Sequence, residues 1–328
     1  MKKNIALVTG GFSGEAVISY KSARTISNNL DRERFEVYRI DINPGGWFYE
    51  QPDGTKTEVD KNDFSISVNG DRIRFDAVFI GMHGTPGEDG KLQGYFDTLG
   101  IPYTGCDAAT SAITFNKRYA VAVAGMSGIA VARSVVLFRE NANSPEQVAE
   151  GLQFPVFVKP NNGGSSIGMS KVDAFTGEFG LAIEKAFRED NQVLVEEMVK
   201  GREFTVGVFR SAGTIIVLPL TEVKAHSDKA FFDFEAKYQG KSTETTPAEV
   251  EEVIADRIRD AARKVYEVFN CRGVVRIDFI YNEKEERPYM LEVNTIPGQS
   301  EASIVPQQVK VMGWSLKEFY TKLVEEVL

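Results

Sequence analysis

Segments typical of β-strands and α-helices alternate over the first third of the chain, and this order restricts the fold more than any other feature. The apolar run NIALVTG at 4–10 precedes a segment with helical periodicity at 15–30, and strand-like runs follow at 35–42 and 76–82, before a helix at 91–100. Strands separated by helices pair most readily in parallel, with the helices on the faces of the sheet. We therefore expect an α/β fold with a parallel, Rossmann-like sheet at its N-terminal end.

The first helical segment carries apolar side chains at helical spacing. Val17, Tyr20, Ala23 and Ile26 would lie on one face of a helix over 15–30. We expect this face to pack against the sheet.

The remainder of the chain mixes helices with strands that follow one another directly, which adds α+β elements to the C-terminal half. At 328 residues the chain is long enough for two or three domains. We expect an N-terminal domain at 1–108, a central domain at 109–205 and a C-terminal domain at 206–328. The expected later elements are a helix at 108–128, strands at 131–138 and 154–160, a helix at 177–190, a strand at 192–199, a hairpin at 203–220, a helix at 248–269, strands at 273–281 and 287–295, and a helix at 316–328.

Charge and cysteine content exclude several classes of protein. The net charge of -9 argues against a nucleic-acid partner, which requires a positive surface. Cys106 and Cys271 are far apart and outside any metal-ligand spacing, so we expect neither a zinc site nor a disulfide framework. The apolar run after MKK is too short for a signal peptide, and no run is long enough to span a membrane. These observations predict a cytoplasmic protein that has no membrane partner.

Two late strand-like segments carry polar groups at alternating positions. Arg276 and Asp278 would share one face of their strand, and Glu292 and Asn294 one face of the next. If the strands pair, a cation, two carboxylates and an amide converge, and such oxygen ligands suit Mg²⁺. The alternative is a solvated sheet face with an Arg–Asp ion pair.

The segment KPNNGGSSIGMSK at 159–171 is rich in glycine, hydroxyl groups and lysine. Lys159 closes an apolar strand, and the glycines let backbone N–H groups approach an anion closely. Ser165 and Ser166 add hydroxyl donors, so the segment suits phosphate, although the P-loop pattern is absent. A flexible surface loop is the alternative.

Two further loops follow strands of the first domain, where α/β sheets bind ligands. GGFSGE at 10–15 lacks the G-x-G-x-x-G spacing, so the signal for NAD is weak, and Glu15 could serve only the helix dipole. HGTPGEDG at 83–90 contains His83, one of two histidines; we expect the other, His226, on the surface. The sequence around Lys117, Lys237 and Tyr238 does not by itself indicate a function for these residues.

Taken together, these segments resemble the D-alanine–D-alanine ligases of the ATP-grasp superfamily. The similarity covers nearly the whole chain, in family order, through GGFSGEAVIS, HGTPGEDGKLQGYFDTLGIPYTG, VFVKPNNGGSSIGMSKV, FFDFEAKY, RIDFI and LEVNTIPGQSEASIVPQ. It implies an ATP-grasp architecture with a substrate-binding N-terminal domain, a small central lid and a C-terminal catalytic domain with an antiparallel sheet.

The resemblance also implies a reaction. ATP would phosphorylate the carboxylate of one D-alanine, and the amine of a second would attack the acyl phosphate to give D-alanyl-D-alanine for peptidoglycan synthesis. Two Mg²⁺ ions, with Mn²⁺ as a possible substitute, would neutralise the phosphates. A homodimer is the assembly that the family suggests.

Residue roles follow from the same resemblance. Glu15 would hold the ammonium of the first D-alanine, with His83 nearby, and would form a cluster with Ser165 and Tyr238. Arg276 and the N–H of Gly298 would stabilise the oxyanion, and Lys237 and Ser303 would bind the second carboxylate. Asp278, Glu292 and Asn294 would hold magnesium. The nucleotide would be bound by Lys117, Lys159, Ser166, Glu196, Val199 and Glu203.

The chain departs from the family pattern at Glu197, which puts recognition of the base in doubt, and at Gln299 and Ser300. Tyr238, in EAKY, favours a dipeptide over the depsipeptide of a D-alanine–D-lactate ligase, which stays an alternative. Another ATP-grasp carboxylate–amine ligase is a second alternative. A non-catalytic nucleotide-binding module is a third, and the intact set of charged residues argues against it.

Overall fold

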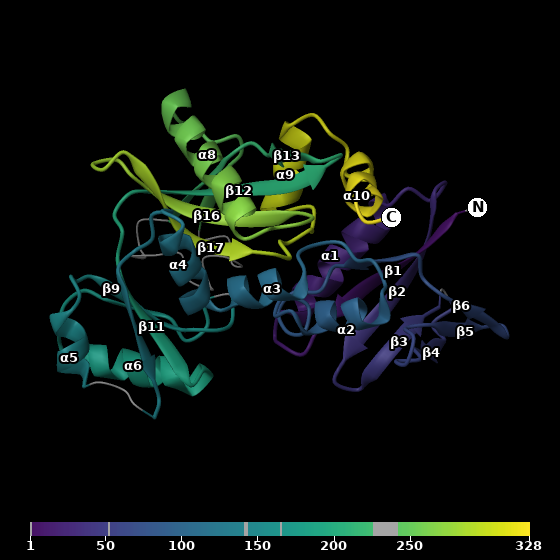
Figure 1. Ribbon diagram of the computed structural model, residues 1–328, viewed down its shortest axis with the longest axis horizontal. Coiled ribbons are helices and arrows are strands. Elements are labelled where there is room, and N and C mark those ends of the chain that lie inside the picture. The colour runs from purple at the N-terminus through teal and green to yellow at the C-terminus, as the bar shows by residue number, and fades with distance from the viewer. Residues whose placement is uncertain (1, 52, 141–143, 165, 226–241) are drawn as a thin grey trace.

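The described residues of the computed structural model form three sheets of four or more strands and a further two-stranded sheet (Figure 1). The structure describes residues 2–51, 53–140, 144–164, 166–225 and 242–328. None of the helices in these ranges is both long and apolar enough to cross a membrane.

The first sheet has the strand order β4-β3-β2-β1-β7. Its parallel part is as predicted, because β1 pairs in parallel with both β2 and β7. The antiparallel strands β3 and β4, which extend one edge, were not predicted. The elements of this region are β1 (Lys3–Gly10), α1 (Ala16–Asn29), β2 (Phe35–Asn43), β3 (Gly46–Glu50), β4 (Lys56–Glu58), the hairpin of β5 (Ile66–Val68) and β6 (Asp71–Ile73), β7 (Ala77–Ile80) and α2 (Lys91–Leu99).

The buried face of α1 differs from the prediction. Ala23 and Ile26 are buried, but Val17 and Tyr20 are exposed, so the expected four-residue apolar face is wrong. Ser19 and Ser22 are fully buried instead, because their hydroxyl groups are bonded to His83. Buried hydroxyl groups are tolerated where they have such partners.

The second sheet is entirely antiparallel, with the order β10-β9-β11-β8. Helices α5 and α6 share one apolar core with it. Its elements are β8 (Ser134–Phe138), α5 (Pro145–Glu150), β9 (Val156–Pro160), β10 (Ser170–Val172), α6 (Gly177–Glu189) and β11 (Gln192–Glu197).

The third sheet, also antiparallel, has the order β15-β14-β12-β16-β17, with β13 paired to β12 as the predicted hairpin. Helix α8 packs against it, and α9 and α10 follow at the C-terminus. The elements are β12 (Arg202–Ser211), β13 (Thr214–Val217), β14 (Thr221–Ala225), β15 (Ser242–Thr245), α8 (Glu252–Val268), β16 (Val275–Asn282), β17 (Arg287–Asn294), α9 (Ile304–Val311) and α10 (Leu316–Glu325).

The single helix predicted over 108–128 is wrong, because Asn116 divides it into α3 (Ala108–Phe115) and α4 (Lys117–Met126). Asn116 is extended, and its side chain accepts a hydrogen bond from Tyr119 N at 3.2 Å. It therefore caps α4, as asparagine does at helix N-termini. The break places Lys117 in the first turn of α4.

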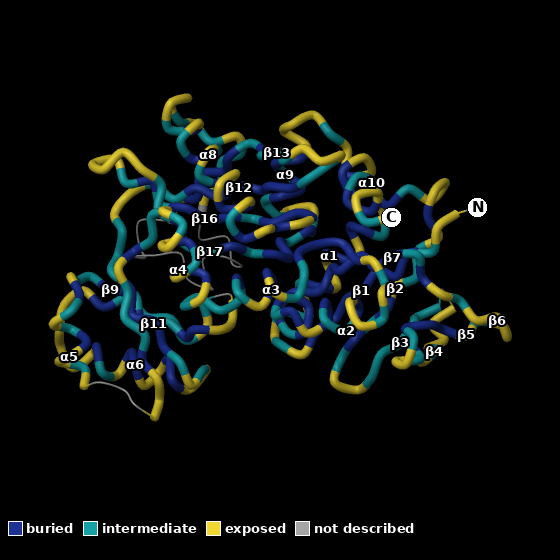
Figure 2. The backbone as a smooth tube through the Cα atoms, in the orientation of Figure 1, coloured by how far each residue is buried: buried dark blue, intermediate teal, exposed yellow. Residues whose placement is uncertain are grey.

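The C-terminal helices join the first and third sheets through one core. Leu7 and Phe79 of the first sheet, Phe209 of the third, and Val309 and Phe319 of α9 and α10 belong to the same buried cluster. Figure 2 shows buried segments in both the first and the third sheet. This packing fixes the first and third sheets relative to each other. The division into three domains stays a prediction.

Candidate active site

Two adjoining cavities lie between the sheets. The first, of about 340 Å³, opens between the first and third sheets and is called the inner cavity here. The second, of about 600 Å³, lies between the second and third sheets and is called the lid cavity. Together they form one cleft, since they share the wall residues Lys117, Gly163, Gly164, Glu203, Val223, Asp278 and Glu292.

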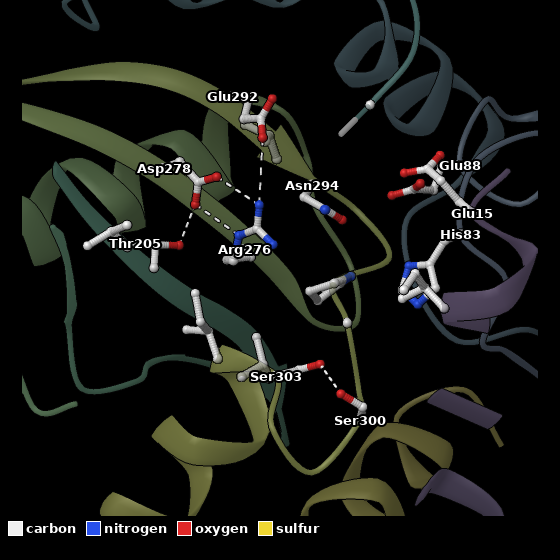
Figure 3. Close-up of a pocket in the computed structure, with 18 of the residues that line it drawn as sticks. Glu15, His83, Glu88, Thr205, Arg276, Asp278, Glu292, Asn294, Ser300 and Ser303 are labelled. Carbon is white, nitrogen blue, oxygen red and sulfur yellow. Dashed lines mark hydrogen bonds and ion pairs between the residues drawn. The ribbon is translucent and has the colours of Figure 1, made fainter. Parts of the chain in front are cut away.

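The predicted pairing of the two late strands is confirmed. In the β16–β17 register, Arg276 lies opposite Asn294 and Asp278 opposite Glu292. Figure 3 shows all four side chains on one surface, facing the inner cavity. The four groups therefore form one polar cluster, as opposite residues of paired strands do.

Arg276 is the centre of this cluster. Its Nε and one terminal nitrogen donate to the two carboxylate oxygens of Asp278, at 2.9 and 2.8 Å, and the same nitrogen lies 3.6 Å from Glu292 Oε1 (Figure 3). Thr205 Oγ1, on β12, donates to Asp278 Oδ1. Asp278 is thus held rigidly between two strands. The ion pair between Arg276 and Asp278 that the alternative expected is present, but Asp278 is only 8% exposed, so this part of the face is not solvated.

The oxygen donors of this cluster fit a magnesium site that is completed by a ligand. Asp278, Glu292 and Asn294 offer two carboxylates and an amide, which are ligands of hard cations. Within the described ranges, however, no group of three or more His, Cys, Asp and Glu side chains could hold a metal ion. Magnesium commonly takes part of its coordination from substrate phosphates, so such a set suffices when a nucleotide is present.

The lid cavity collects every residue that the sequence assigned to a nucleotide: Lys117, Lys159, Ser166, Glu196, Val199 and Glu203. Lys159 Nζ lies 3.0 Å from Glu196 Oε2 across the β9–β11 pair, and both side chains are largely buried. Lys117 Nζ donates to Gly163 O at 2.6 Å, which holds the glycine-rich loop against α4. Lys117, Lys159 and the glycine-rich loop therefore line the same cavity.

Glu15 lies between the loops of two sheets. A Cβ atom on Gly164, in the glycine-rich loop, would lie 2.9 Å from Glu15 Oε1. A Cβ atom on Gly84, in the loop after β7, would lie 2.7 Å from Glu15 Oε2. The carboxylate is therefore in close contact with both backbones. The expected cluster of Glu15 with Ser165 and Tyr238 stays a prediction, because Ser165 and Tyr238 lie outside the described residues.

His83 lines the inner cavity, although its side chain is almost entirely buried. Its Nε2 is 2.8 Å from Ser22 Oγ, and its backbone N–H donates to Ser19 Oγ at 2.9 Å. Burial lowers the pKa of His83 to about 4. A hydrogen bond to the backbone of Ile296 acts in the opposite direction but does not outweigh the burial. The imidazole is therefore neutral at pH 7 and positions its neighbours without carrying charge.

Glu88 is a site residue that the sequence reasoning missed, although it lies in the loop that was selected for His83. It lines the inner cavity beside Glu15 (Figure 3). Its Oε2 accepts from Gly84 N at 2.6 Å. Burial and the Glu15 carboxylate raise the pKa of Glu88 to about 8, so the pair carries a proton near neutrality.

Ser303 and Gly298 lie together at the start of α9. Ser303 occupies the N-cap position, but its hydroxyl group is bonded to Ser300 Oγ at 2.8 Å instead of capping the helix (Figure 3). A Cβ atom on Gly298 would lie 2.8 Å from Ser303 Oγ. A carboxylate in the inner cavity could thus meet a hydroxyl group at a positively polarised helix end.

Some of the predicted residues cannot be placed. Ser165, Lys237 and Tyr238 lie outside the described residues, as does His226. Gln299, one of the departures from the family, is buried and bonded to Pro297 O and the Tyr320 hydroxyl, which is a structural role. Besides Glu88, the sequence reasoning missed Thr205 and Glu244, because they line the inner cavity only through strand pairing.

The fold is that of an ATP-grasp enzyme, as comparison with solved structures confirms. The chain is similar to the VanG D-Ala:D-Ser ligase from Enterococcus faecalis, with 31% identity, full coverage of both chains and a TM-score of 0.90. It is also similar to a D-alanine–D-alanine ligase from Bacillus anthracis, solved in complex with ATP, with 25% identity, coverage of 99% and 97%, and a TM-score of 0.77.

Curated relatives and family descriptions narrow the class further. Residues 4–106 match "D-ala D-ala ligase N-terminus" and residues 123–325 match "D-ala D-ala ligase C-terminus". D-alanine–D-alanine ligases from Flavobacterium johnsoniae and Phocaeicola vulgatus are 43% and 42% identical, over 98% and 99% of both chains. The chain therefore belongs to the D-alanine–D-alanine ligase family.

Proposed function

We propose that this protein joins two D-alanines to D-alanyl-D-alanine at the expense of ATP. The observation that carries the proposal is the meeting of two cavities at Asp278 and Glu292. One cavity has lysines and a glycine-rich rim suited to a nucleotide. The other has carboxylates, an arginine and a helix N-terminus suited to amino-acid zwitterions. A phosphoryl group can pass between them only at the shared wall.

The chemistry assigns a role to each part of the cleft. A carboxylate is a poor electrophile, and transfer of a phosphoryl group from ATP gives it a leaving group; this transfer needs positioning and charge neutralisation more than covalent help. Lys117 and Lys159 would neutralise the phosphates. Arg276 and the N–H of Gly298 would stabilise the oxyanion that forms when the second amine attacks the acyl phosphate.

The two amino acids would bind at different parts of the inner cavity. Glu15 would bind the ammonium of the first, while Ser303 and the start of α9 would bind the carboxylate of the second. Lys237, Ser165 and Tyr238 complete this proposal on family grounds. Glu196, Val199 and Glu203 would contact the adenosine, and Ser166 the phosphates.

Magnesium belongs to the same proposal. Asp278, Glu292 and Asn294 would hold two Mg²⁺ ions together with the phosphates of ATP, and the ions would supply charge neutralisation when bound. We also propose that the product enters peptidoglycan synthesis, that the protein acts in the cytoplasm and that it is a homodimer. The divisions at 108 and 205 remain our proposed domain boundaries.

A second candidate differs only in the second substrate. Similarity to the D-Ala:D-Ser ligase favours D-serine as a possible partner, and D-lactate is a further alternative. The curated relatives at 39–43% identity are all named D-alanine–D-alanine ligases, which favours D-alanine.

Competition between nucleophiles tests the proposal. The protein is incubated with ATP, Mg²⁺, D-alanine, D-serine and D-lactate, and the products are identified by mass spectrometry at neutral and acidic pH. We expect ATP-dependent D-alanyl-D-alanine to dominate at neutral pH. The fraction of product made from D-lactate should rise at acidic pH, because an amine nucleophile must be deprotonated before it attacks. If the depsipeptide or D-alanyl-D-serine dominates, the second substrate is D-lactate or D-serine and not D-alanine. If no ligation product forms at all, the proposal is overturned.

A further inference from the structure

Glu244 is a carboxylate of the inner cavity that has no role in the scheme above. It lies on the edge strand β15, where it pairs with Val223 of β14. It lines the inner cavity but not the lid cavity. Its position therefore points to an amino acid rather than to the nucleotide.

The register places Glu244 on the catalytic face of the third sheet. Val223 lies opposite Glu244 on one side and opposite Glu203 on the other, so the three side chains share a face. Thr205, two residues beyond Glu203, lies opposite Asp278 and therefore points the same way. Glu244 thus belongs to the same surface as the Arg276 cluster.

Glu244 differs from the other acidic groups around it. It is half-buried, yet within the described part of the chain its carboxylate makes no hydrogen bond and no ion pair. By contrast, Glu222, its neighbour on the opposite face of the sheet, is paired with Arg202 and Lys224. A half-buried carboxylate without a partner is unfavourable, and a bound cation would remove the penalty.

The charges around Glu244 and its position in the cavity indicate which kind of cation it would bind. Burial and Asp278 raise the pKa of Glu244, while Arg276 lowers it. Arg276 acts in the same direction on Glu88, so it lies within electrostatic reach of both carboxylates. The Glu15–Glu88 pair comes from the first sheet and Glu244 from the third, which gives the cavity two separate acidic positions for two ammonium groups.

We propose that Glu244 binds the ammonium group of the second amino acid and so selects an amine over a hydroxyl nucleophile. This inference rests on the proposed function. Ser303 and the helix end would bind the carboxylate of the second amino acid, and Glu244 its nitrogen. The bound ammonium would pass one proton to the Glu244 carboxylate, and the free amine would then attack the acyl phosphate, from which phosphate leaves. A metal ion is a poorer occupant, because Glu244 lies off the wall that the two cavities share.

A partition experiment separates the second substrate from the first half-reaction. Hydroxylamine is uncharged at neutral pH and traps an acyl phosphate as the hydroxamate. Its reaction needs ATP and the first D-alanine but no binding site for a second ammonium group. The ratio of dipeptide to hydroxamate is measured with subsaturating D-alanine for the wild type and for Glu244→Gln. Because the ratio is taken within one sample, it does not depend on how much of the protein is folded.

We expect Glu244→Gln to lower this ratio about tenfold or more, which corresponds to one hydrogen bond between charged groups. Glu244→Asp, which keeps the charge, should recover part of the loss. Thr243→Val is the matched control, since Thr243 is exposed on the opposite face of the same strand, and its ratio should equal that of the wild type.

The outcomes distinguish this inference from the proposed function. If the wild type forms neither product, the proposed function fails. If the wild type forms both and Glu244→Gln keeps the wild-type ratio, only the role of Glu244 is overturned. An equal fall in dipeptide and hydroxamate also leaves the ratio unchanged and overturns it in the same way.

Discussion

Arg276 and Asp278 stand two residues apart on β16 and face each other through two parallel hydrogen bonds, of 2.9 and 2.8 Å. Adjacent side chains on one face of a strand can form such a pair without any turn of the backbone. The ion pair fixes the guanidinium in the inner cavity, and a fixed donor costs no reorganisation when charge develops in a reaction.

Replacing Arg276 with lysine is expected to lower kcat strongly. Lysine keeps the charge but cannot bind Asp278 through two parallel bonds, so the cation loses its fixed direction. Loss of an oriented oxyanion donor lowers kcat by about 100-fold or more. Steady-state kinetics should show this with little change in the KM for ATP. Arg287→Lys, an exposed change on the neighbouring strand, is the control; an Arg276→Lys enzyme with normal kcat would exclude a catalytic role.

Gly164→Ala should impair the enzyme through Glu15. The added Cβ would lie 2.9 Å from Glu15 Oε1, closer than real Cβ contacts allow, so either the carboxylate or the glycine-rich loop must shift. We expect kcat/KM for D-alanine to fall by about tenfold or more, as small displacements of positioning groups do. Gly177→Ala adds a methyl group in open space at the start of α6 and should be neutral. Equal kinetics of the two variants would contradict the contact.

Lys159→Met is expected to raise the KM for ATP by about tenfold, the cost of one charge-assisted hydrogen bond. Lys171→Met is a matched control, because Lys171 is similarly buried and paired with an acid, Asp173, yet lines neither cavity. Calorimetric titration with ATP measures the affinity of both variants for the nucleotide. If they weaken ATP equally, the effect belongs to the stability of the second sheet and not to phosphate binding.

Glu88 should make stability depend on pH. Its pKa is raised from 4.5 to about 8, so between these values the folded protein holds a proton that the unfolded chain has released. Stability from this group is present at low pH and is lost as the pH rises through the folded pKa. Glu88→Gln should therefore lose less stability than the wild type between pH 5 and pH 8. Melting temperatures across this range test it, and parallel curves for the two proteins would show that Glu88 ionises normally.

Much of the polar surface of β16 and β17 could be predicted from the sequence because it depends on local alternation. Arg276 and Asp278 share a face in any strand, and so do Glu292 and Asn294. Only their pairing had to be assumed. The α1 face could not be predicted in the same way, since the buried Ser19 and Ser22 depend on His83, which comes from a distant strand end.

Glu88 and Glu244 show what local patterns miss. The sequence reasoning missed Glu88 because the local pattern GEDG at 87–90 does not indicate that Glu15 lies beside it and raises its pKa. Glu244 enters the site through the β14–β15 register, from a stretch with no clear periodicity. Both are acidic residues, which in a sequence are typical of solvated surface.

The sequence by itself determined the alternation of strands and helices, the polar faces of β16 and β17 and the glycine-rich segment after β9, since each depends on neighbouring residues and backbone geometry. Tertiary structure decided which of these meet. It brought Cys106 and Cys271 into one core as free thiols and joined two cavities at Asp278 and Glu292. It also left Glu244 at the inner cavity with no hydrogen bond or ion pair among the residues that the structure describes. Such meetings depend on packing between distant segments, where burial and the field of neighbouring charges are set by the whole fold.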